Sequence, residues 1–169
     1  IEVAEKNILW LKVQTHGKQT HGSTPDEGIN AKLASCALAL KINALEKELD
    51  KRDSLFAPDR STLQPTKQEA NVPNVNTIPG DDIMYFDCRI LPVYSLDFVR
   101  EKIKKCCDEI ASQYGVTFTI SEEQASESPA TSEDCEVVKV LEGAVRRVLN
   151  LEPRIVGIGG GTVAACLRS

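Results

Sequence analysis

The order in which strand-like and helix-like hydrophobic spacing alternates along the chain is the feature that most constrains its fold. Hydrophobic residues recur at every second position in strands and at intervals of three or four in helices. On this basis we predict strands at residues 8–15, 61–68, 83–90 and 116–121 and helices at 30–49 and 95–114. Pro65 assigns the second strand to an edge of the sheet, since proline cannot donate to the ladder. This β-α-β-β-α-β order predicts an α+β fold of the ferredoxin-like type, with two helices on one face of a four-stranded antiparallel sheet.

The two helices are predicted from their hydrophobic stripes and from the residues at their ends. In the first helix the stripe includes Leu33, Leu40 and Ile42. In the second helix Ser95 is a suitable N-cap, and Gly115 is placed where a glycine stops a helix. The second helix is therefore bounded at both ends by the sequence alone.

The strand at residues 83–90 has one hydrophobic face and one polar face. Asp87 and Arg89 are two positions apart, so they project from the same side of the sheet. Two interpretations stay open for them: a structural ion pair, or a site in which the planar guanidinium holds a substrate carboxylate. Asn76, in the NTIP turn before this strand, offers an amide near the same region, although asparagine beside proline is also ordinary turn chemistry.

The chain has two histidines, His16 and His21. His21 lies in GKQTHGSTP, a glycine-bounded loop between a strand and a long helix, where an imidazole is held by its neighbours and stays accessible. It is a candidate donor of a hydrogen bond or a proton, and the alternative is a plain surface histidine. His16 lies at a strand end without a surrounding motif, and we expect it to be incidental.

A second candidate site is the GIGGGT segment near the end of the chain. Its backbone N–H groups at Gly160, Gly161 and Thr162 can converge on an anion, because the segment follows a short strand and precedes a helix. The segment matches neither the Walker loop nor the GxGxxG dinucleotide fingerprint, which argues against a nucleotide. Binding of a carboxylate or of substrate backbone is one interpretation, and a tight packing turn is the other.

The last third of the chain differs from the rest. A polar stretch rich in serine and containing proline is predicted to be a linker, and after it we expect a helix at 134–150, a strand at 154–156 and the start of another helix. This α-β-α run is typical of a layered α/β domain, with too little chain to close a core. We therefore predict a domain at 6–124, a linker at 125–133 and an incomplete α/β segment at 134–169. The opening IEVAEKN, without methionine, also suggests a piece of something longer.

Composition excludes several function classes. The 25 acidic residues exceed the 20 basic ones, giving a net charge of −5, which argues against a nucleic-acid partner. No apolar stretch approaches the length of a membrane span, so no membrane partner is expected. Two histidines are too few for a site with several imidazole ligands. The six cysteines show no CxxC spacing, which predicts reduced thiols in a cytoplasmic protein.

Four motifs together carry a resemblance to a known family. They are EKNILWLKV; GKQTHGSTP followed by INA; NTIP before the strand with Asp87 and Arg89, which ends near Pro92; and GGGTVAA. In this order they resemble the zinc-dependent aminoacylases and deacylases, a metallopeptidase family that includes acetylornithine deacetylase and succinyl-diaminopimelate desuccinylase.

The resemblance implies a two-domain hydrolase of N-acylated amino acids, used in amino-acid biosynthesis. A ferredoxin-like lid, usually also the homodimerisation domain, is inserted into a catalytic domain that holds two zinc (or cobalt) ions. The family's metal ligands and its catalytic glutamate match no segment of these 169 residues. We therefore expect no metal ligand and no cofactor in this chain, and no hydrolase activity from it alone.

The resemblance also assigns roles to individual residues. His21 matches the lid histidine that stabilises the oxyanion, often in the active site of the other subunit. Asn76 and Arg89 match lid residues that hold the substrate, and Gly161 and Thr162 match the loop that lines its pocket. Many members have an acidic residue where this chain has Val163, which leaves the substrate subclass open.

Two alternatives come from other classes of protein. A ferredoxin-like sheet of this size also serves as a stand-alone module that binds a small molecule on its open face. It can equally be a purely structural dimerisation domain. The exposed edge strand of such a sheet supports dimer formation in each case.

Overall fold

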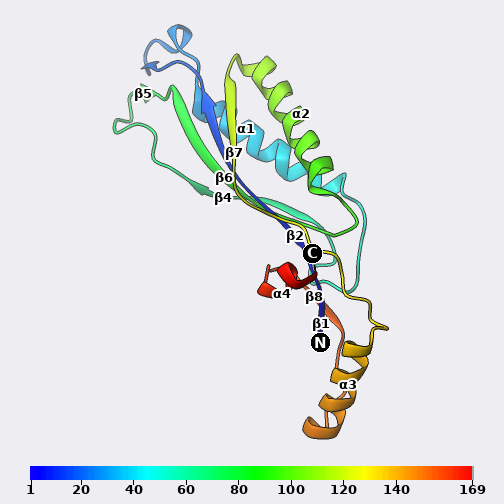
Figure 1. The fold of residues 1–169 in the computed structure, drawn as a ribbon. Helices are drawn as coiled ribbons and strands as arrows, with labels where there is room; N and C mark the ends of the chain where they lie inside the picture. Colours follow the sequence, from blue (N-terminus) through cyan, green and yellow to red (C-terminus); the bar gives the residue numbers. More distant parts are fainter. Residues whose placement is uncertain (169) are drawn as a thin grey trace.

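The structure is a computed structural model that describes residues 1–168, apart from the side chain of Cys166. Its main sheet contains four antiparallel strands in the order β4–β6–β2–β7, and α1 and α2 cover one face of it (Figure 1). The elements are β2 (Asn7–His16), α1 (Ala31–Ala44), β4 (Thr62–Gln68), β6 (Asp81–Ile90), α2 (Leu96–Tyr114) and β7 (Thr117–Ser126). The predicted α+β, ferredoxin-like fold is therefore confirmed.

Helix α2 begins and ends at the residues that the sequence predicted. The Ser95 side chain accepts a hydrogen bond from the Phe98 backbone N–H at 3.2 Å. Gly115 ends the helix with φ of 70°, a left-handed conformation that glycine adopts without strain. Helix α1 is capped in the same way by Asn30, whose side chain accepts from Leu33 N–H at 3.1 Å.

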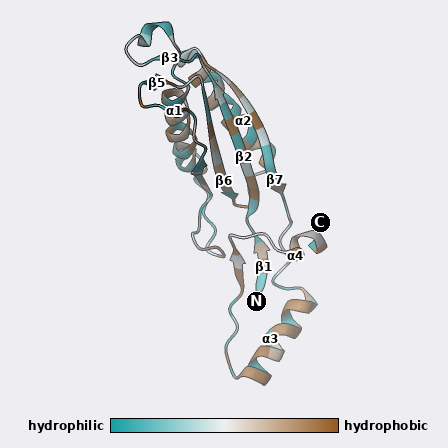
Figure 2. Ribbon diagram, turned by 90° about the vertical axis from the view of Figure 1, so that its left-hand side faces the viewer, coloured by the Kyte–Doolittle hydropathy of each residue, from teal (hydrophilic) through white to brown (hydrophobic). Residues whose placement is uncertain are grey.

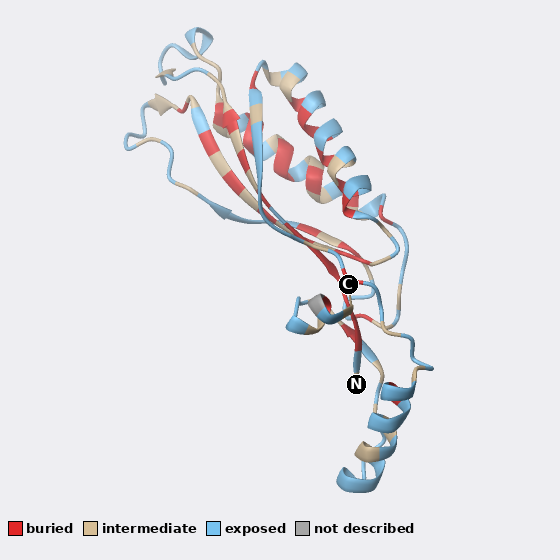
Figure 3. Ribbon diagram, viewed as in Figure 1, coloured by how far each residue is buried: buried red, intermediate tan, exposed pale blue. Residues whose placement is uncertain are grey.

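The main core lies between the sheet and the two helices, and Figure 3 shows buried positions along the strands of the sheet and along both helices. In β2 the side chains of Leu9, Leu11 and Val13 are buried, and in β6 those of Phe86 and Cys88. This is the alternation predicted from spacing. Burying each apolar side chain of this size stabilises the folded state by about 1.5–3 kcal/mol.

The predicted stripe of α1 is wrong at two positions. Leu33 and Leu40 are 57% and 75% exposed, whereas Ala34, Leu38 and Ile42 are buried. The buried positions recur at intervals of three or four, and positions 33 and 40 fall off this face of the helix. The regular helix also ends at Ala44, earlier than predicted, and continues as a 3₁₀ turn at Leu45–Lys47.

A second, smaller unit lies beyond the end of the sheet. Strand β1 (Glu2–Glu5) pairs in parallel with β8 (Val156–Ile158), next to α3 (Glu136–Leu149) and the short α4 (Val163–Arg168) (Figure 1). This unit has its own buried cluster, formed by Val3, Ala4, Phe56, Leu91 and Val138.

The sequence predicted this second unit only in part. Helix α3 was expected, but β1 was not, and β8 begins two residues later than predicted. Strand β7 extends to Ser126, so residues 122–126 form strand where the sequence suggested the start of a linker. Figure 2 shows the hydrophobic character of α3, and several of its apolar side chains are exposed: Val137, Val140, Leu141, Val148 and Leu149.

The loop at residues 48–61 connects the two units. Its Phe56 packs in the second cluster, and the Gly157 backbone N–H donates to Leu55 O at 2.7 Å. Lys6, only 3% exposed, donates from Nζ to Pro58 O at 2.8 Å and to Arg60 O at 2.6 Å. Burial lowers the pKa of the Lys6 ammonium.

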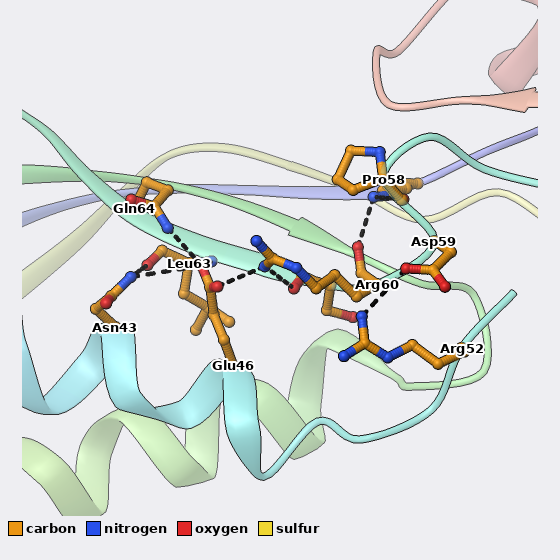
Figure 4. A network of polar contacts seen from close by, with 10 residues as sticks. Asn43, Glu46, Arg52, Pro58, Asp59, Arg60, Leu63 and Gln64 are labelled. Carbon is orange, nitrogen blue, oxygen red and sulfur yellow. Dashed lines mark hydrogen bonds and ion pairs between the residues drawn. The ribbon is translucent and has the colours of Figure 1, made fainter.

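Glu46, just after α1, fixes the other end of this loop (Figure 4). Its carboxylate accepts from the Leu63 N–H at 2.8 Å, from Gln64 Nε2 at 2.6 Å and from Arg60 Nη1 at 2.5 Å. The loop is therefore tied both to the 3₁₀ turn that follows α1 and to the second unit. Within residues 1–168, no helix is long and apolar enough to cross a membrane.

Candidate functional site

His21 and Asn76 meet at the far tip of the main sheet. His21 belongs to β3 (Thr20–His21), which pairs antiparallel with β5 (Thr77–Ile78), and Asn76 directly precedes β5. The Gly22 N–H also donates to Asn76 O at 2.7 Å. This short ladder brings together two residues that are 55 positions apart, with Asn76 Nδ2 at 3.1 Å from His21 Nε2.

The other imidazole nitrogen of His21 contacts Ser23, a residue that the sequence analysis did not single out. Nδ1 lies 2.7 Å from Ser23 Oγ and 3.2 Å from the Ser23 backbone nitrogen. Both His21 and Ser23 are exposed. The ring is thus held by local contacts on an open surface and remains within reach of another molecule.

The turn that leads to Asn76 is held by a buried carboxylate. Asp82 of β6 has a side chain with 0% exposure. It accepts hydrogen bonds from Gln68 Nε2 at 2.9 and 3.0 Å and from Asn71 Nδ2 at 2.7 Å, and Lys32 Nζ lies 3.8 Å away. Sequence reasoning missed this residue because Asp82 lies two positions after Gly80, in a Gly-Asp-Asp stretch where a turn is the ordinary expectation.

Arg89 forms the ion pair that was one of its two interpretations. Its Nε and Nη2 donate to the Asp87 carboxylate at 2.6 and 3.0 Å, and Nη1 donates to Gly159 O at 3.0 Å. The guanidinium carbon lies 5.5 Å from the centre of the Trp10 ring. Arginine has five N–H donors, so two are left without a partner among residues 1–168.

The glycine segment, residues 159–161, follows β8. The next residue, Thr162, binds an anionic group, the Glu5 carboxylate of the same chain. The Thr162 backbone N–H and hydroxyl donate to Glu5 at 2.7 and 2.6 Å, and Arg168 Nη2 donates at 2.5 Å. A Cβ on Gly161 would lie 2.7 Å from Ile8 Cδ1, so the loop packs closely on the base of the sheet. Both the binding and the packing interpretations therefore have a physical basis.

The structure does not bring all the predicted site residues together. Asp81 and Arg89 are eight residues apart on β6, a separation of roughly 27 Å along an extended strand. His21 and Asn76 lie beyond the Asp81 end of this strand, and the glycine loop lies beside Arg89. Figure 1 shows β5 at one end of the main sheet and β8 beyond the other end of that sheet. We call the two groups the tip group (His21 and Asn76) and the base group (Arg89, Gly161 and Thr162).

A metal site would require several carboxylate, imidazole or thiolate ligands in one place. Among residues 1–168 no three such side chains come together. The residues described here therefore do not fit a metal ion.

A match to a known family defines the class of this protein. The chain belongs to the peptidase dimerisation domain family, whose model matches residues 3–115. The matched region contains the main sheet apart from β7, both covering helices, the tip group and Arg89. This membership confirms the family that the four sequence motifs indicated.

Two relatives of known sequence show which proteins this chain resembles. The chain is 40% identical over 181 residues to an uncharacterised metallohydrolase of Methanocaldococcus jannaschii, covering 99% of this chain and 43% of that protein. It is 27% identical over 163 residues to a succinyl-diaminopimelate desuccinylase of Wolinella succinogenes, and this match covers 96% of this chain and 42% of that protein. The chain thus spans about two fifths of the length of these relatives. They place it among relatives of metal-dependent hydrolases.

Solved structures show the same fold. A tripeptidase from Staphylococcus aureus superposes with a TM-score of 0.77 at 19% identity, over 98% of this chain and 41% of that one. An aminopeptidase from Bacillus cereus superposes with a TM-score of 0.78 at 18% identity, over 98% of this chain and 41% of that one. Because the superposition includes almost the whole of this chain, the second unit also has its counterpart in these proteins.

Proposed function

We propose that this chain is the lid and dimerisation part of a metal-dependent amide hydrolase that removes acyl groups from amino acids. The family membership and the metallohydrolase relatives support a role in a hydrolase. Desuccinylases among the relatives support the narrower substrate class, as in a succinyl-diaminopimelate desuccinylase or an acetylornithine deacetylase of the cytoplasm. On this proposal residues 6–124 are the lid, and residues 134–169 belong to the catalytic domain.

The separation of the tip and base groups carries the proposal. Asp81, at the end of β6 nearest the tip group, is already roughly 27 Å from Arg89, so one small substrate cannot contact both groups of one chain. A two-fold dimer solves this problem, because the tip group of one protomer can reach the base group of its partner. Each active site would then contain His21 and Asn76 from one chain and Arg89 and the glycine loop from the other.

The contacts of these residues suit such a site. The His21 imidazole would donate a hydrogen bond to the oxyanion that forms when water adds to the amide carbonyl, which is worth about 3 kcal/mol in the transition state. The two N–H groups of Arg89 that have no partner among residues 1–168 are suited to a substrate carboxylate. Gly161 and Thr162 would line the pocket at the base.

The dimer surface that we propose consists of α1 and the edge of β4. Leu33 and Leu40 are exposed on α1, and a groove of about 380 Å³ runs beside the helix. Its lining residues are Cys36, Ala39, Leu40, Asn43, Gln64, Pro65 and Met84.

The metal, zinc or cobalt, would be held by a part of the hydrolase outside this chain. When bound, it would supply an activated water and polarise the amide carbonyl. The lid residues would orient the substrate and stabilise the developing charge. On this proposal the 169-residue chain alone has no hydrolase activity.

Complementation between two inactive variants tests the proposal in a protein that joins this chain to its metal-bearing part. His21→Ala and Arg89→Ala should each lower turnover at least 100-fold, whereas His16→Ala should not. Mixing the two inactive variants should restore about a quarter of wild-type activity, because half of random pairs are mixed and each mixed pair has one intact site. No recovery in confirmed mixed dimers would show that each site is built within one chain and would refute the proposal.

A further inference from the structure

The hydrogen bonds around His21 determine which of its ring nitrogens carries the proton. The backbone N–H of Ser23 points at Nδ1, with the nitrogen 3.2 Å away. A backbone N–H can only donate, so Nδ1 must accept and cannot itself carry a hydrogen. The Ser23 hydroxyl, 2.7 Å from the same nitrogen, can rotate and donates as well.

With Nδ1 accepting, the proton of the neutral ring lies on Nε2. We propose that Ser23 is a positioning residue that locks His21 in the Nε2–H tautomer and aims this proton away from the loop. The Asn76 amide nitrogen Nδ2 lies 3.1 Å from Nε2 and can only donate, so the Nε2–H tautomer requires the opposite orientation of this amide. The amide satisfies the Nε2–H when Oδ1 faces the ring, which a half-turn of the amide group provides.

The other histidine has the opposite arrangement in the same chain. His16 Nδ1 lies 2.7 Å from the carboxylate of Asp81, and its Nε2 lies 3.0 Å from the Thr119 hydroxyl. An ionised carboxylate can only accept, so His16 must carry a hydrogen on Nδ1. His16 therefore serves as a built-in reference for the other tautomer.

The consequence for function rests on the proposed role of His21. An oxyanion needs a donor, and in the locked tautomer Nε2 is the donor even when the ring is neutral. Asn76 would hold this N–H in the free protein and release it when a substrate carbonyl arrives. Ser23 would thus determine which atom of His21 faces the substrate without contacting the substrate itself.

Ring-nitrogen NMR of the 169-residue chain tests the assignment directly. With ¹⁵N-labelled histidine the spectrum contains only two imidazoles, because the chain has only two histidines. The spectrum is recorded at pH about 8.5, on the alkaline side of the ordinary imidazole pKa of ~6.5. We expect the ¹⁵N shifts of His21 to be those of a pure Nε2–H ring. His16→Gln assigns the signals.

Three substitutions separate the effect of Ser23 from a general loss of structure. Ser23→Ala removes the hydroxyl but keeps the backbone N–H at 3.2 Å from Nδ1, so both His21 shifts should move only part of the way toward the averaged values of a free imidazole. Ser23→Thr, which keeps the hydroxyl, should restore the wild-type pattern. Ser23→Asp should move the proton to Nδ1, as in His16. A wild-type His21 protonated on Nδ1, or shifts unchanged in both Ser23→Ala and Ser23→Asp, would overturn the proposal.

An activity measurement distinguishes this inference from the proposed function. In the protein that joins this chain to its metal-bearing part, Ser23→Asp should lower turnover about as much as His21→Ala, with little change in KM. If the NMR result holds but neither variant alters turnover, the tautomer assignment stands and the proposed role of His21 fails. If Ser23→Asp shifts the proton and turnover remains high while His21→Ala abolishes it, the positioning role of Ser23 is refuted.

Discussion

Glu5 and Thr162 are 157 positions apart in the sequence and are joined by two hydrogen bonds, from the Thr162 N–H at 2.7 Å and from its hydroxyl at 2.6 Å. Glu5 is only 2% exposed, and Arg168 pairs with the same carboxylate. Because Glu5 ends β1 just before the chain enters the main sheet, this contact ties the glycine loop to the junction of the two units.

The first prediction follows from this contact. Glu5→Gln removes the negative charge from a buried site that faces an N–H, a hydroxyl and a guanidinium. We expect the free energy of unfolding to fall by about 2–3 kcal/mol, since hydrogen bonds to charged groups are worth about 1.5–3 kcal/mol each and the amide keeps one acceptor. Urea denaturation at pH 7 measures this change in the free energy of unfolding. Glu2→Gln, an exposed position on the same strand, should change stability by less than about 0.5 kcal/mol. Equal stability of the two variants would contradict the prediction.

A second prediction concerns two glycines with different surroundings. A Cβ on Gly157 would lie 2.5 to 2.8 Å from ring atoms of Phe56, whereas a Cβ on Gly143, inside α3, would meet nothing within 4 Å. Gly157→Ala should lower the free energy of unfolding by about 1–3 kcal/mol, because the Phe56 ring must leave its place in the second cluster. Gly143→Ala should stabilise by up to about 1 kcal/mol through helix propensity. Thermal unfolding of both variants checks the signs, and a stabilising Gly157→Ala would show that the loop at residues 48–61 does not pack on β8.

The sequence predicted the main sheet well because its signals are local. Alternation in β2 and β6, the Ser95 cap and the positive φ of Gly115 depend on residues close in the chain. The errors came from tertiary contacts. Strand β1 exists because β8 pairs with it from 153 or 154 positions away, and the exposure of Leu33 and Leu40 depends on which face of α1 packs on the sheet.

The candidate site was predictable in its residues but not in its arrangement. The HGSTP and NTIP motifs pointed to His21 and Asn76, and the β3–β5 ladder places them side by side. Ser23 lay inside the quoted motif, yet only the geometry shows its contact with Nδ1. Glu5 gave no sequence signal, because its partners come from the other end of the chain.

A third prediction tests the proposed dimer surface. Leu40 is 75% exposed on α1 beside the groove next to β4, so Leu40→Glu should leave the protomer folded and place a charge in the interface. We expect the wild-type chain to sediment as a dimer and the variant as a monomer at micromolar concentration. Val93→Glu changes a residue that is 65% exposed between β6 and α2, and it should remain dimeric. A dimeric Leu40→Glu would exclude this face.

The last prediction concerns stability at alkaline pH. Burial raises the pKa of the Cys88 and Cys107 thiols to about 12. In the unfolded chain a thiol titrates near pH 8.5, so between these values the folded state binds more protons and the free energy of unfolding falls as pH rises. Each thiol contributes a slope of up to about 1.4 kcal/mol per pH unit, and this stability is fully present only below about pH 8.5. Cys107→Ala should therefore reduce the slope measured by urea denaturation between pH 9 and 10.5. Val99→Ala, which removes a buried group without a thiol, should lower stability equally at every pH. An unchanged slope in Cys107→Ala would show that this thiol ionises in the folded protein.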